Sequence, residues 1–355
     1  MLRNLMMGAL WLTLGFSHLS AEEQAVVQET PDIHPLSLET PENPNGNTNV
    51  ISDLEFSPDS KMLAVAYGRY QALLQKSDPG LAIVWDVASG KRLATLNKYK
   101  DGVSSISFSS NGKLLATGSY DGTVQIWRGS NWSRQALIKV VSGPVTALDF
   151  SPDSTSIAVG TTVQGEVPMK PNLHLYQVAT GREMISLRCP AIDVAGVQYS
   201  PDGKSLVYAG MNGVVQVWNV ESGGSRTILQ SDDMMLFSMT LSHDGRQIAA
   251  GGSPFQYKHK KWQIQIWDTD SGKLKQKKTE AGCMLSSVRF SPDDRWLIIA
   301  SLESRVKLWN LSTGQLINLS QPGGDVAVSP DGKLLALAVE NKVTLLEFKK
   351  LIEKR

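Results

Sequence analysis

The sequence is poor in three things that mark common protein classes: cysteine, net charge and long hydrophobic runs. Its 355 residues include two cysteines, Cys189 and Cys283, too few for a scaffold held together by disulfides. Its 35 basic and 34 acidic residues nearly cancel, so no long-range attraction draws the chain to nucleic acid or anionic lipid. Its five histidines show no metal-ligand spacing. We therefore expect neither a nucleic-acid partner nor a metal or other cofactor.

The first 21 residues have the layout of a secretory signal peptide. Arg3 precedes an uncharged apolar run of twelve residues, Leu5–Phe16, and small residues end the segment before Glu22. A membrane-spanning helix needs about 20 apolar residues, so this run is too short for an anchor and no membrane insertion is expected. These features predict an exported protein, periplasmic or secreted, with residues 1–21 removed.

Imperfect copies of one unit fill residues 50–348. Each copy has a short alternating run, a turn of the Ser-Pro-Asp-Gly kind and further short runs rich in β-branched and aromatic residues; the cleanest is FSSNGKLLATGSYDGTVQIW, residues 108–127. Seven turn serines, spaced 38 to 52 residues apart, mark the copies: Ser57, Ser109, Ser151, Ser200, Ser242, Ser291 and Ser329. Four strands per unit at this spacing predict an all-β fold, a seven-bladed β-propeller.

The last copy is one strand short. It has runs at 325–328, 334–339 and 343–348, and a basic tail, 349–355, follows. An unpaired sheet edge invites association with other chains. The proline-rich linker at 22–49 contains one alternating run, 33–39, and we expect this strand to complete the last blade and close the ring.

The ends of the third strands carry a resemblance to a known family. Val-Gln-Ile-Trp127, Ile-Gln-Ile-Trp267-Asp268 and Ile-Val-Trp85-Asp86 resemble the closing strand of the WD-repeat β-propeller family. The resemblance covers residues 50–348 and implies four-stranded antiparallel blades. It further implies a monomeric, non-enzymatic scaffold that binds a protein or peptide, and with the signal peptide it indicates a bacterial member.

The same resemblance implies a hydrogen-bonded network in the second copy. In the family, a Ser or Thr on the second strand and an Asp in the next turn join the Trp of the third strand. Ser119, Asp121 and Trp127 stand at these positions. The family's Gly-His pair is absent, and residues 97–101 stand in its place.

The copies differ in length at one place only. From the turn serine to the end of the third strand the distances are 28, 18, 25, 18, 25, 18 and 17 residues, so copies 1, 3 and 5 carry an insertion between their second and third strands. These loops are residues 68–80, 162–172 and 252–262. Insertions confined to one loop type project from one face, which in repeat folds is often the binding face. The alternative is neutral drift of exposed loops.

Aromatic and basic residues in these loops are the binding candidates, because such side chains anchor interfaces. They are Arg69, Tyr70, Phe255, Tyr257, Lys258 and Trp262. The basic run 258–261 has no matching stripe elsewhere, so a solvated loop explains it better than nucleic-acid binding.

A second class of function is a metal-assisted hydrolase, of the lactonase or esterase type, at the mouth of the central channel. First strands line the channel, and their polar positions include Asp53, Glu55, Asp149, Arg289 and Asp325. Carboxylates there could hold a Ca²⁺-like ion. Ion pairing with Arg289 and hydration of the channel is the reading we favour, because no nucleophile and base accompany these side chains.

Two of the histidines and both cysteines have structural interpretations. His243 replaces Pro in a turn, and His174 in a third strand is expected to pack in the interior. Cys189 and Cys283 fall in loops two blade boundaries apart. Because a disulfide needs Cα atoms within about 7 Å, we expect two free buried thiols.

Overall fold

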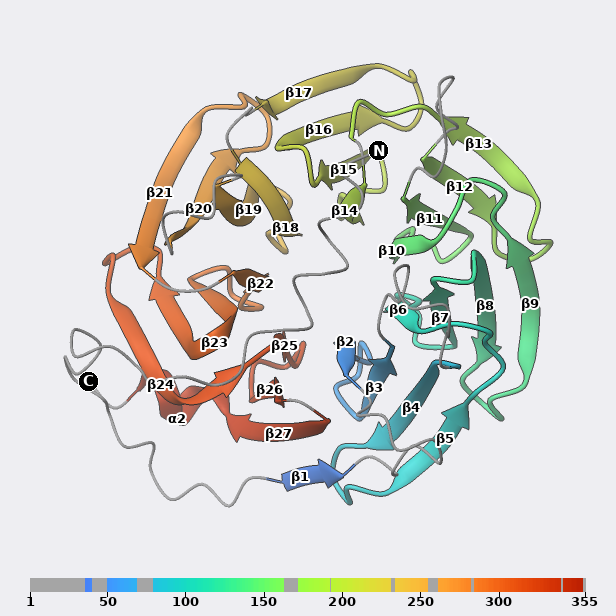
Figure 1. Cartoon of the computed structure of the whole chain (residues 1–355), viewed down its shortest axis with the longest axis horizontal. Helices are drawn as coiled ribbons and strands as arrows, with labels where there is room; N and C mark the ends of the chain where they lie inside the picture. The colour runs from blue at the N-terminus through green and yellow to red at the C-terminus, as the bar shows by residue number, and fades with distance from the viewer. Residues whose placement is uncertain are drawn as a thin grey trace.

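The computed structural model describes most of the chain after residue 35. The described residues are 36–39, 50–68, 79–162, 172–191, 193–230, 234–254, 261–281, 284–339 and 341–353. Nearly all of them lie in β-strands or in the short turns between strands, and the molecule is a ring of seven antiparallel sheets around a central channel (Figure 1). Among the described residues, no helix is both long and apolar enough to cross a membrane.

Each blade runs outward from the channel in chain order. Blade 1 contains β2 (Ile51–Phe56), β3 (Met62–Tyr67), β4 (Leu81–Asp86) and β5 (Arg92–Leu96); blade 2 contains β6 (Val103–Phe108), β7 (Leu114–Ser119), β8 (Thr123–Arg128) and β9 (Arg134–Lys139). Blade 3 contains β10 (Val145–Phe150), β11 (Ser156–Thr161), β12 (Leu173–Gln177) and β13 (Glu183–Leu187); blade 4 contains β14 (Val194–Tyr199), β15 (Ser205–Gly210), β16 (Val214–Asn219) and β17 (Ser225–Gln230).

The second half of the chain repeats this pattern, with longer strands in blade 5. Blade 5 contains β18 (Met234–Leu241), β19 (Gln247–Pro254), β20 (Lys261–Asp268) and β21 (Leu274–Ala281). Blade 6 contains β22 (Leu285–Phe290), β23 (Trp296–Asn310) and β24 (Leu316–Gly323); the first half of β23 pairs with β22 and its second half with β24. Blade 7 contains β25 (Asp325–Val328), β26 (Leu334–Val339) and β27 (Lys342–Glu347).

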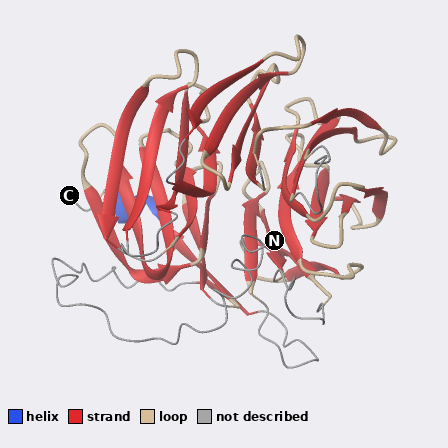
Figure 2. Ribbon diagram, turned by 45° about the horizontal axis from the view of Figure 1, so that its top comes forward, coloured by secondary structure: helices blue, strands red, loops and turns tan. Residues whose placement is uncertain are grey.

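The N-terminal strand completes blade 7, as the sequence predicts. β1 (Leu36–Glu39) pairs antiparallel with β27, with Leu38 opposite Val343. The rest of the predicted strand, 33–35, lies outside the described residues. The predicted tail instead begins with a short helix, α2 (Phe348–Ile352), because Phe348 and Leu351 find an apolar surface against blades 6 and 7 (Figure 2).

The turn between the first and second strands has one hydrogen-bond design in all seven blades. The buried serine donates its Oγ–H to the side chain two residues later, as Ser57 does to Asp59 at 2.6 Å. In blade 2 the acceptor is the side chain of Asn111, 2.8 Å from Oγ of Ser109. The same Oγ accepts the N–H of the residue five positions later in blades 1 to 7; for Ser57 this is Met62, at 2.9 Å. These bonds satisfy polar groups inside the turn and explain why serine recurs there.

Three of these turns carry a residue other than glycine in the left-handed region. Ser60, Ser154 and Asp294 have φ of 61°, 60° and 56°. Each side chain accepts an N–H from the turn of the preceding blade: Ser60 from Asp331, Ser154 from Asn111, and Asp294 from His243 and Asp244. The left-handed backbone therefore comes with a hydrogen bond between blades, and His243 has the structural setting expected of it.

The hydrophobic core is divided among the seams between blades. Seven clusters of buried side chains each combine residues of two neighbouring blades, and the cluster at the closing seam joins Leu38 and Val343 of blade 7 to Leu54 and Trp85 of blade 1. Burial of apolar surface is the main favourable term in folding. Contact between neighbouring blades thus stabilises the ring, so every blade depends on both of its neighbours.

Candidate functional site

The three predicted long connections leave the blades at the same end. In every blade the second strand runs from the serine turn toward this end, and the third strand returns from it. The connections of blades 1, 3 and 5 therefore belong to one face of the ring, which we call the loop face. Five binding candidates, Arg69, Tyr70, Phe255, Tyr257 and Lys258, lie in these connections, outside the described residues.

Glycines hold the two ends of the blade 1 connection. The N–H of Gly68 donates to the carbonyl of Val50, and the N–H of Gly80 to that of Asp101, both at 3.0 Å. A Cβ at either glycine would overlap the backbone of Gly102 and Val103. Both ends are therefore fixed against neighbouring loops, and this close approach requires glycine.

Asn172 holds the C-terminal end of the blade 3 connection. The side chain of Asn172, which is almost fully buried, donates to the carbonyl of Ala191 and accepts the N–H of Cys189 at 2.9 Å. Cys189 is a buried free thiol whose pKa burial raises to about 11, so it is protonated at neutral pH. Cys283 lies outside the described residues, so the expected second free thiol stays a prediction.

The connection in blade 5 is shorter than the sequence predicts. Strand β19 continues to Pro254 and β20 begins at Lys261, so residues 252–254 and 261–262 belong to strands rather than to a loop. Trp262 is fully buried in the cluster between blades 5 and 6, with the amine of Lys307 5.8 Å from its ring centroid. The prediction of Trp262 as an exposed contact is corrected: its alternation in the longer strand turns it to the core.

The tryptophan network of blade 2 uses a different partner from the one predicted. Trp127 donates its Nε1–H to Oγ1 of Thr117 at 2.9 Å, and the hydroxyl of Tyr99 lies 2.6 Å from the same oxygen. Ser119 instead donates to the carbonyl of Gly102, and its Oγ accepts the N–H of Asp121 at 3.1 Å. Thr117 lies two residues before Ser119 on the same strand, so the spacing alone did not separate the two.

Asp121 holds the loop that contains Tyr99. Its Oδ2 accepts the N–H of Lys100 at 2.9 Å, and its Oδ1 accepts the hydroxyl proton of Thr123 at 2.6 Å. Tyr99 thus reaches the network from residues 97–101, where the family's Gly-His pair is missing. Blade 2 keeps a buried polar network around its tryptophan although its members differ from those expected.

Carboxylates on the innermost strands join each blade to the next. Asp53 accepts the N–H of Ile106 at 2.8 Å, Glu55 that of Phe108 at 2.9 Å, and Asp149 that of Tyr199 at 2.6 Å. In each case the acceptor lies in one blade and the donor in the following blade. Three of the predicted channel carboxylates therefore act in the described structure as inter-blade acceptors, whereas Asp325 accepts the N–H of Val326 in its own blade.

Where the ring closes, the charge of Asp325 opposes the ionisation of Asp53. Burial and the nearby Asp325 together raise the pKa of Asp53 to about 7, although Arg289, 3.6 Å from Asp53, acts to lower it. Burial also raises the pKa of Asp325, and it raises the pKa of Asp149 to about 7. The predicted pairing with Arg289 is present. Across the described ranges, no three His, Cys, Asp or Glu side chains are grouped in a way that could hold a metal ion.

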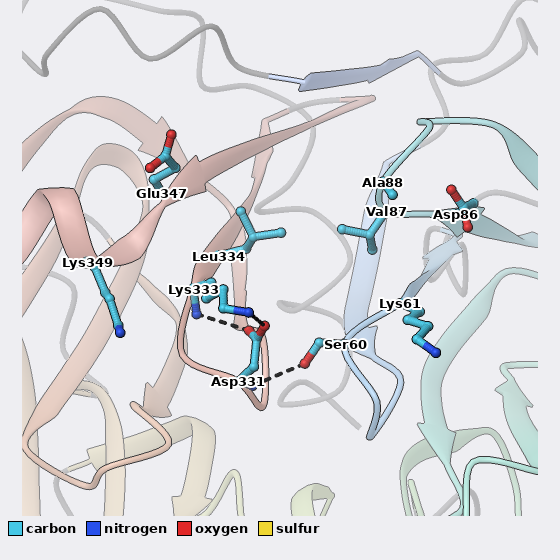
Figure 3. A pocket seen from close by; sticks show the side chains of 10 residues that line it. All are labelled: Ser60, Lys61, Asp86, Val87, Ala88, Asp331, Lys333, Leu334, Glu347 and Lys349. Carbon is cyan, nitrogen blue, oxygen red and sulfur yellow. Dashed lines mark hydrogen bonds and ion pairs between the residues drawn. The ribbon is translucent and has the colours of Figure 1, made fainter.

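A cavity of about 560 Å³ lies between blades 7 and 1, among the serine turns at the end of the ring opposite the loop face (Figure 3). Asp331 lies at its centre, bonded through its N–H to Ser60 of blade 1 and paired with Lys333 at 3.0 Å. Val87 of blade 1 and Leu334 of blade 7 form part of its wall. The sequence analysis did not find this cavity, because its walls come from opposite ends of the chain.

Comparison with known proteins agrees with this geometry. Residues 90–128, 182–219 and 274–310 match the model of the WD domain, G-beta repeat. Each matched stretch begins at or beside the outer strand of one blade and ends with the third strand of the next. The sequence repeat therefore spans a seam, and a fourth strand must be supplied from the other end of the chain.

Relatives share the repeats over part of their length. The chain is 30% identical to the Periodic tryptophan protein 2 homolog of Neurospora crassa over 39% of this chain and 17% of the relative. It is 23% identical to the homolog of Schizosaccharomyces pombe over 67% of this chain and 19% of the relative. With the human Angio-associated migratory cell protein it shares 24% identity over 50% of this chain and 39% of the relative.

The chain is thus a seven-bladed β-propeller, and three of its stretches match the WD domain, G-beta repeat, a repeat that is typical of protein-interaction scaffolds. It spans well under half the length of each of these relatives. All three relatives are eukaryotic, so they give no support to the expected bacterial membership.

Proposed function

We propose that this propeller is an exported, non-enzymatic scaffold that binds a protein or peptide through the loop face. One observation carries the proposal: the insertions that distinguish blades 1, 3 and 5 all belong to the same end of the ring. Neutral insertion would have no reason to avoid the loops of the opposite end. Arg69, Tyr70, Phe255, Tyr257 and Lys258 are the proposed contacts.

Two features of the described residues support a binding role for this face. Gly68 and Gly80 fix both ends of the blade 1 connection, and Asn172 fixes one end of the blade 3 connection. The proposed contacts in blade 1 therefore start from rigid stems. Val141, in a connection on the same face, is 83% exposed, the highest value among the large apolar side chains of the described chain. An exposed apolar side chain beside rigid loop stems fits a surface that a partner covers.

The test is to shorten the connections of blades 1 and 3 to the length found in blade 2 and, in blade 5, to replace Phe255, Tyr257 and Lys258 by alanine, which keeps β19 and β20. In this variant, the turn serines of blades 1 and 3 are 18 residues from the ends of their third strands, as in the second copy. Its melting temperature should stay within a few degrees of the wild type, because the strands and seams are unchanged. Affinity capture from the native host, followed by mass spectrometry, should recover partners with the wild type and lose them with the variant. Equal recovery by a folded variant would refute the role of the loops.

Export is proposed on the basis of residues 1–21. Cell fractionation with N-terminal sequencing of the mature protein tests it independently. We expect a mature chain that begins at Glu22 in an extracytoplasmic fraction. An intact N-terminus in the cytoplasm would overturn this part of the proposal and leave the binding face to be judged separately.

A further inference from the structure

Three polar side chains from separate segments form a continuous hydrogen-bonded chain at the seam between blades 2 and 3. Oγ of Ser142 lies 2.8 Å from Nε2 of His174, and Nδ1 of the same imidazole lies 2.6 Å from Oε1 of Glu183. Ser142 lies in the connection from the outer strand β9 to the inner strand β10, His174 lies in β12, and Glu183 begins β13 (Figure 1). The order hydroxyl, imidazole, carboxylate is that of a nucleophilic triad.

The carboxylate determines the direction of these hydrogen bonds. An ionised carboxylate only accepts, so Nδ1 of His174 carries a proton and donates it to Glu183. Nε2 then has a free lone pair, and Ser142 donates its O–H to it. His174 is 3% exposed, so water competes little for the bond to buried Ser142, whereas the carboxylate of Glu183 is 44% exposed and also faces solvent. The serine proton therefore already points at a base, which is the arrangement that activates a hydroxyl as a nucleophile.

The corresponding position in blade 2 shows what a purely structural bridge looks like. Gln125, like His174, lies two residues before the aromatic end of a third strand. Its Nε2 donates to the carbonyl of Lys98 at 2.8 Å, and its Oε1 accepts from Arg134 at 3.1 Å. An amide thus links the connecting loop to the outer strand as well as an imidazole does, but it cannot accept a proton from a hydroxyl near neutral pH. Bridging alone does not require a histidine between a serine and a carboxylate.

From this geometry we propose that Ser142 is an activated nucleophile that accepts acyl or phosphonyl groups from small activated esters. His174 is the general base, and Glu183 is a positioning residue that holds the imidazole in the required tautomer. This activity does not depend on the scaffold role, and it would replace the proposal that the protein is non-enzymatic. It also differs from a metal-assisted hydrolase in the channel, because it lies at another place and uses no metal.

The proposed acyl transfer balances within these groups and the ester. Oγ of Ser142 forms a bond to the carbonyl carbon while its proton passes to Nε2 of His174. When the tetrahedral intermediate collapses, the bond from carbon to the leaving oxygen breaks and that oxygen takes the proton from Nε2. Water then repeats the sequence in place of Ser142, which releases the carboxylic acid and restores the serine.

Backbone donors lie beside Ser142. Ser142 itself is buried, at 5% exposed, although its neighbour Val141 is 83% exposed. Within the described ranges, the backbone N–H groups of Ser142 and Gly143 have no hydrogen-bond acceptor. Backbone N–H groups beside a nucleophile are the donors that stabilise the oxyanion of acyl transfer.

Labelling of the full chain with a fluorophosphonate probe tests the proposal. Attack by Oγ would form an O–P bond and expel fluoride, which leaves a stable adduct that peptide mapping can locate. We expect the adduct on Ser142 of the folded protein, none on the denatured protein, and none in the S142A variant. If the folded wild type gives no adduct on Ser142, the proposal is wrong and the three side chains form a structural bridge only.

The H174Q variant separates chemistry from folding, because blade 2 uses glutamine at this position. Its melting temperature should match the wild type within a few degrees, while labelling should fall about 100-fold or more. E183Q should also slow labelling, because an amide can donate to Nδ1 and favour the wrong tautomer, and E183D should recover part of the rate. S186A, at the other serine near this imidazole, is the control and should label normally. Undiminished labelling of folded H174Q would overturn the proposal.

Discussion

Two seams of the ring have similar apolar clusters but differ in how the chain runs through them. The chain passes directly from blade 2 to blade 3, whereas blades 7 and 1 come from opposite ends of the sequence. Each has an apolar cluster to which a fourth strand contributes a buried residue, Leu38 at the first seam and Ile138 at the second. Both residues occupy the same register, opposite Val343 and Val124. Ile138 reaches its seam from the adjoining strand, whereas Leu38 arrives from the other end of the sequence.

The two seams also differ in charge near the channel. At the seam of blades 2 and 3, Ser104 donates to the carbonyl of Val145 at 2.7 Å. At the closing seam, burial raises the pKa of both Asp53 and Asp325, Asp325 adds to the rise at Asp53, and Arg289 lowers both. A ring of near-identical units therefore has one seam that is both non-contiguous in sequence and sensitive to protonation.

Placing a charge in the closing strand should have the largest effect. In L38D, a carboxylate replaces a side chain that is 1% exposed, at a cost of about 4 kcal/mol or more. Because β1 pairs with blade 7 along one edge only, we expect it to detach locally. Hydrogen exchange should then rise in β27 and remain low in β6 to β9, and the melting temperature should fall.

The matched variant is I138D, at the same register of the other seam. Ile138 is 3% exposed, so its burial is comparable, but β9 is tied to the chain at both ends. Here exchange should rise in blades 2 and 3 together, with general loss of stability. If β27 in L38D kept its wild-type protection, β1 would not be needed to close the ring.

The pH dependence of stability should come from the closing seam. The pKa of Asp53 is about 7 in the folded protein, against 3.8 for the ordinary group, so the folded state binds this proton more tightly than the unfolded state. The resulting stabilisation is present in acid and is lost as the pH rises through about 7. The free energy of unfolding should therefore decrease between these pH values, by up to about 1.4 kcal/mol per pH unit.

The D53N variant should weaken this decrease, because the amide does not titrate and can still accept the N–H of Ile106. Urea unfolding from pH 4 to pH 8 measures the slope. Part of the slope should persist, because burial also raises the pKa of Glu55 and of Asp149. The S52A variant, which removes a hydroxyl that donates to the carbonyl of Val103 and does not titrate, is the control. A slope unchanged in D53N would contradict the assignment to this seam.

The fold could be predicted from the sequence because each pattern that indicates it lies within a short stretch of the chain. The turn serines, the strand alternation and the spacing recur seven times, so the copies confirm one another. The same locality explains the errors. Trp262 was placed in a loop because nothing local shows that β19 and β20 run beyond the usual length. Thr117 was missed because Ser119 fits the family pattern equally well in spacing.

The candidate sites depend on contacts that no local pattern reveals. Asp53 and Asp325 come together only because the ring closes, and Ser142 meets His174 across a seam. Sequence analysis placed His174 correctly in the interior, but it had no means to identify the serine and the carboxylate at its two ends. Local sequence patterns therefore predict the blades, whereas the two candidate sites consist of side chains from neighbouring blades.

We expect the smallest effect at the serine turns, where each of the two seams has a hydrogen bond to the hydroxyl of a serine in the left-handed region. Ser60 accepts the N–H of Asp331 at 3.1 Å across the closing seam, and Ser154 accepts the N–H of Asn111 at 3.4 Å across the other. Glycine at either position relieves a left-handed backbone by about 1 kcal/mol and removes a hydrogen bond of about 0.5–1.5 kcal/mol. S60G and S154G should thus each change the free energy of unfolding by less than about 1 kcal/mol in urea titrations, with S60G the less stable of the two because it loses the shorter bond. A loss above about 2 kcal/mol in S60G alone would mean that this bond holds the closing seam, which lacks the chain continuity that supports the other.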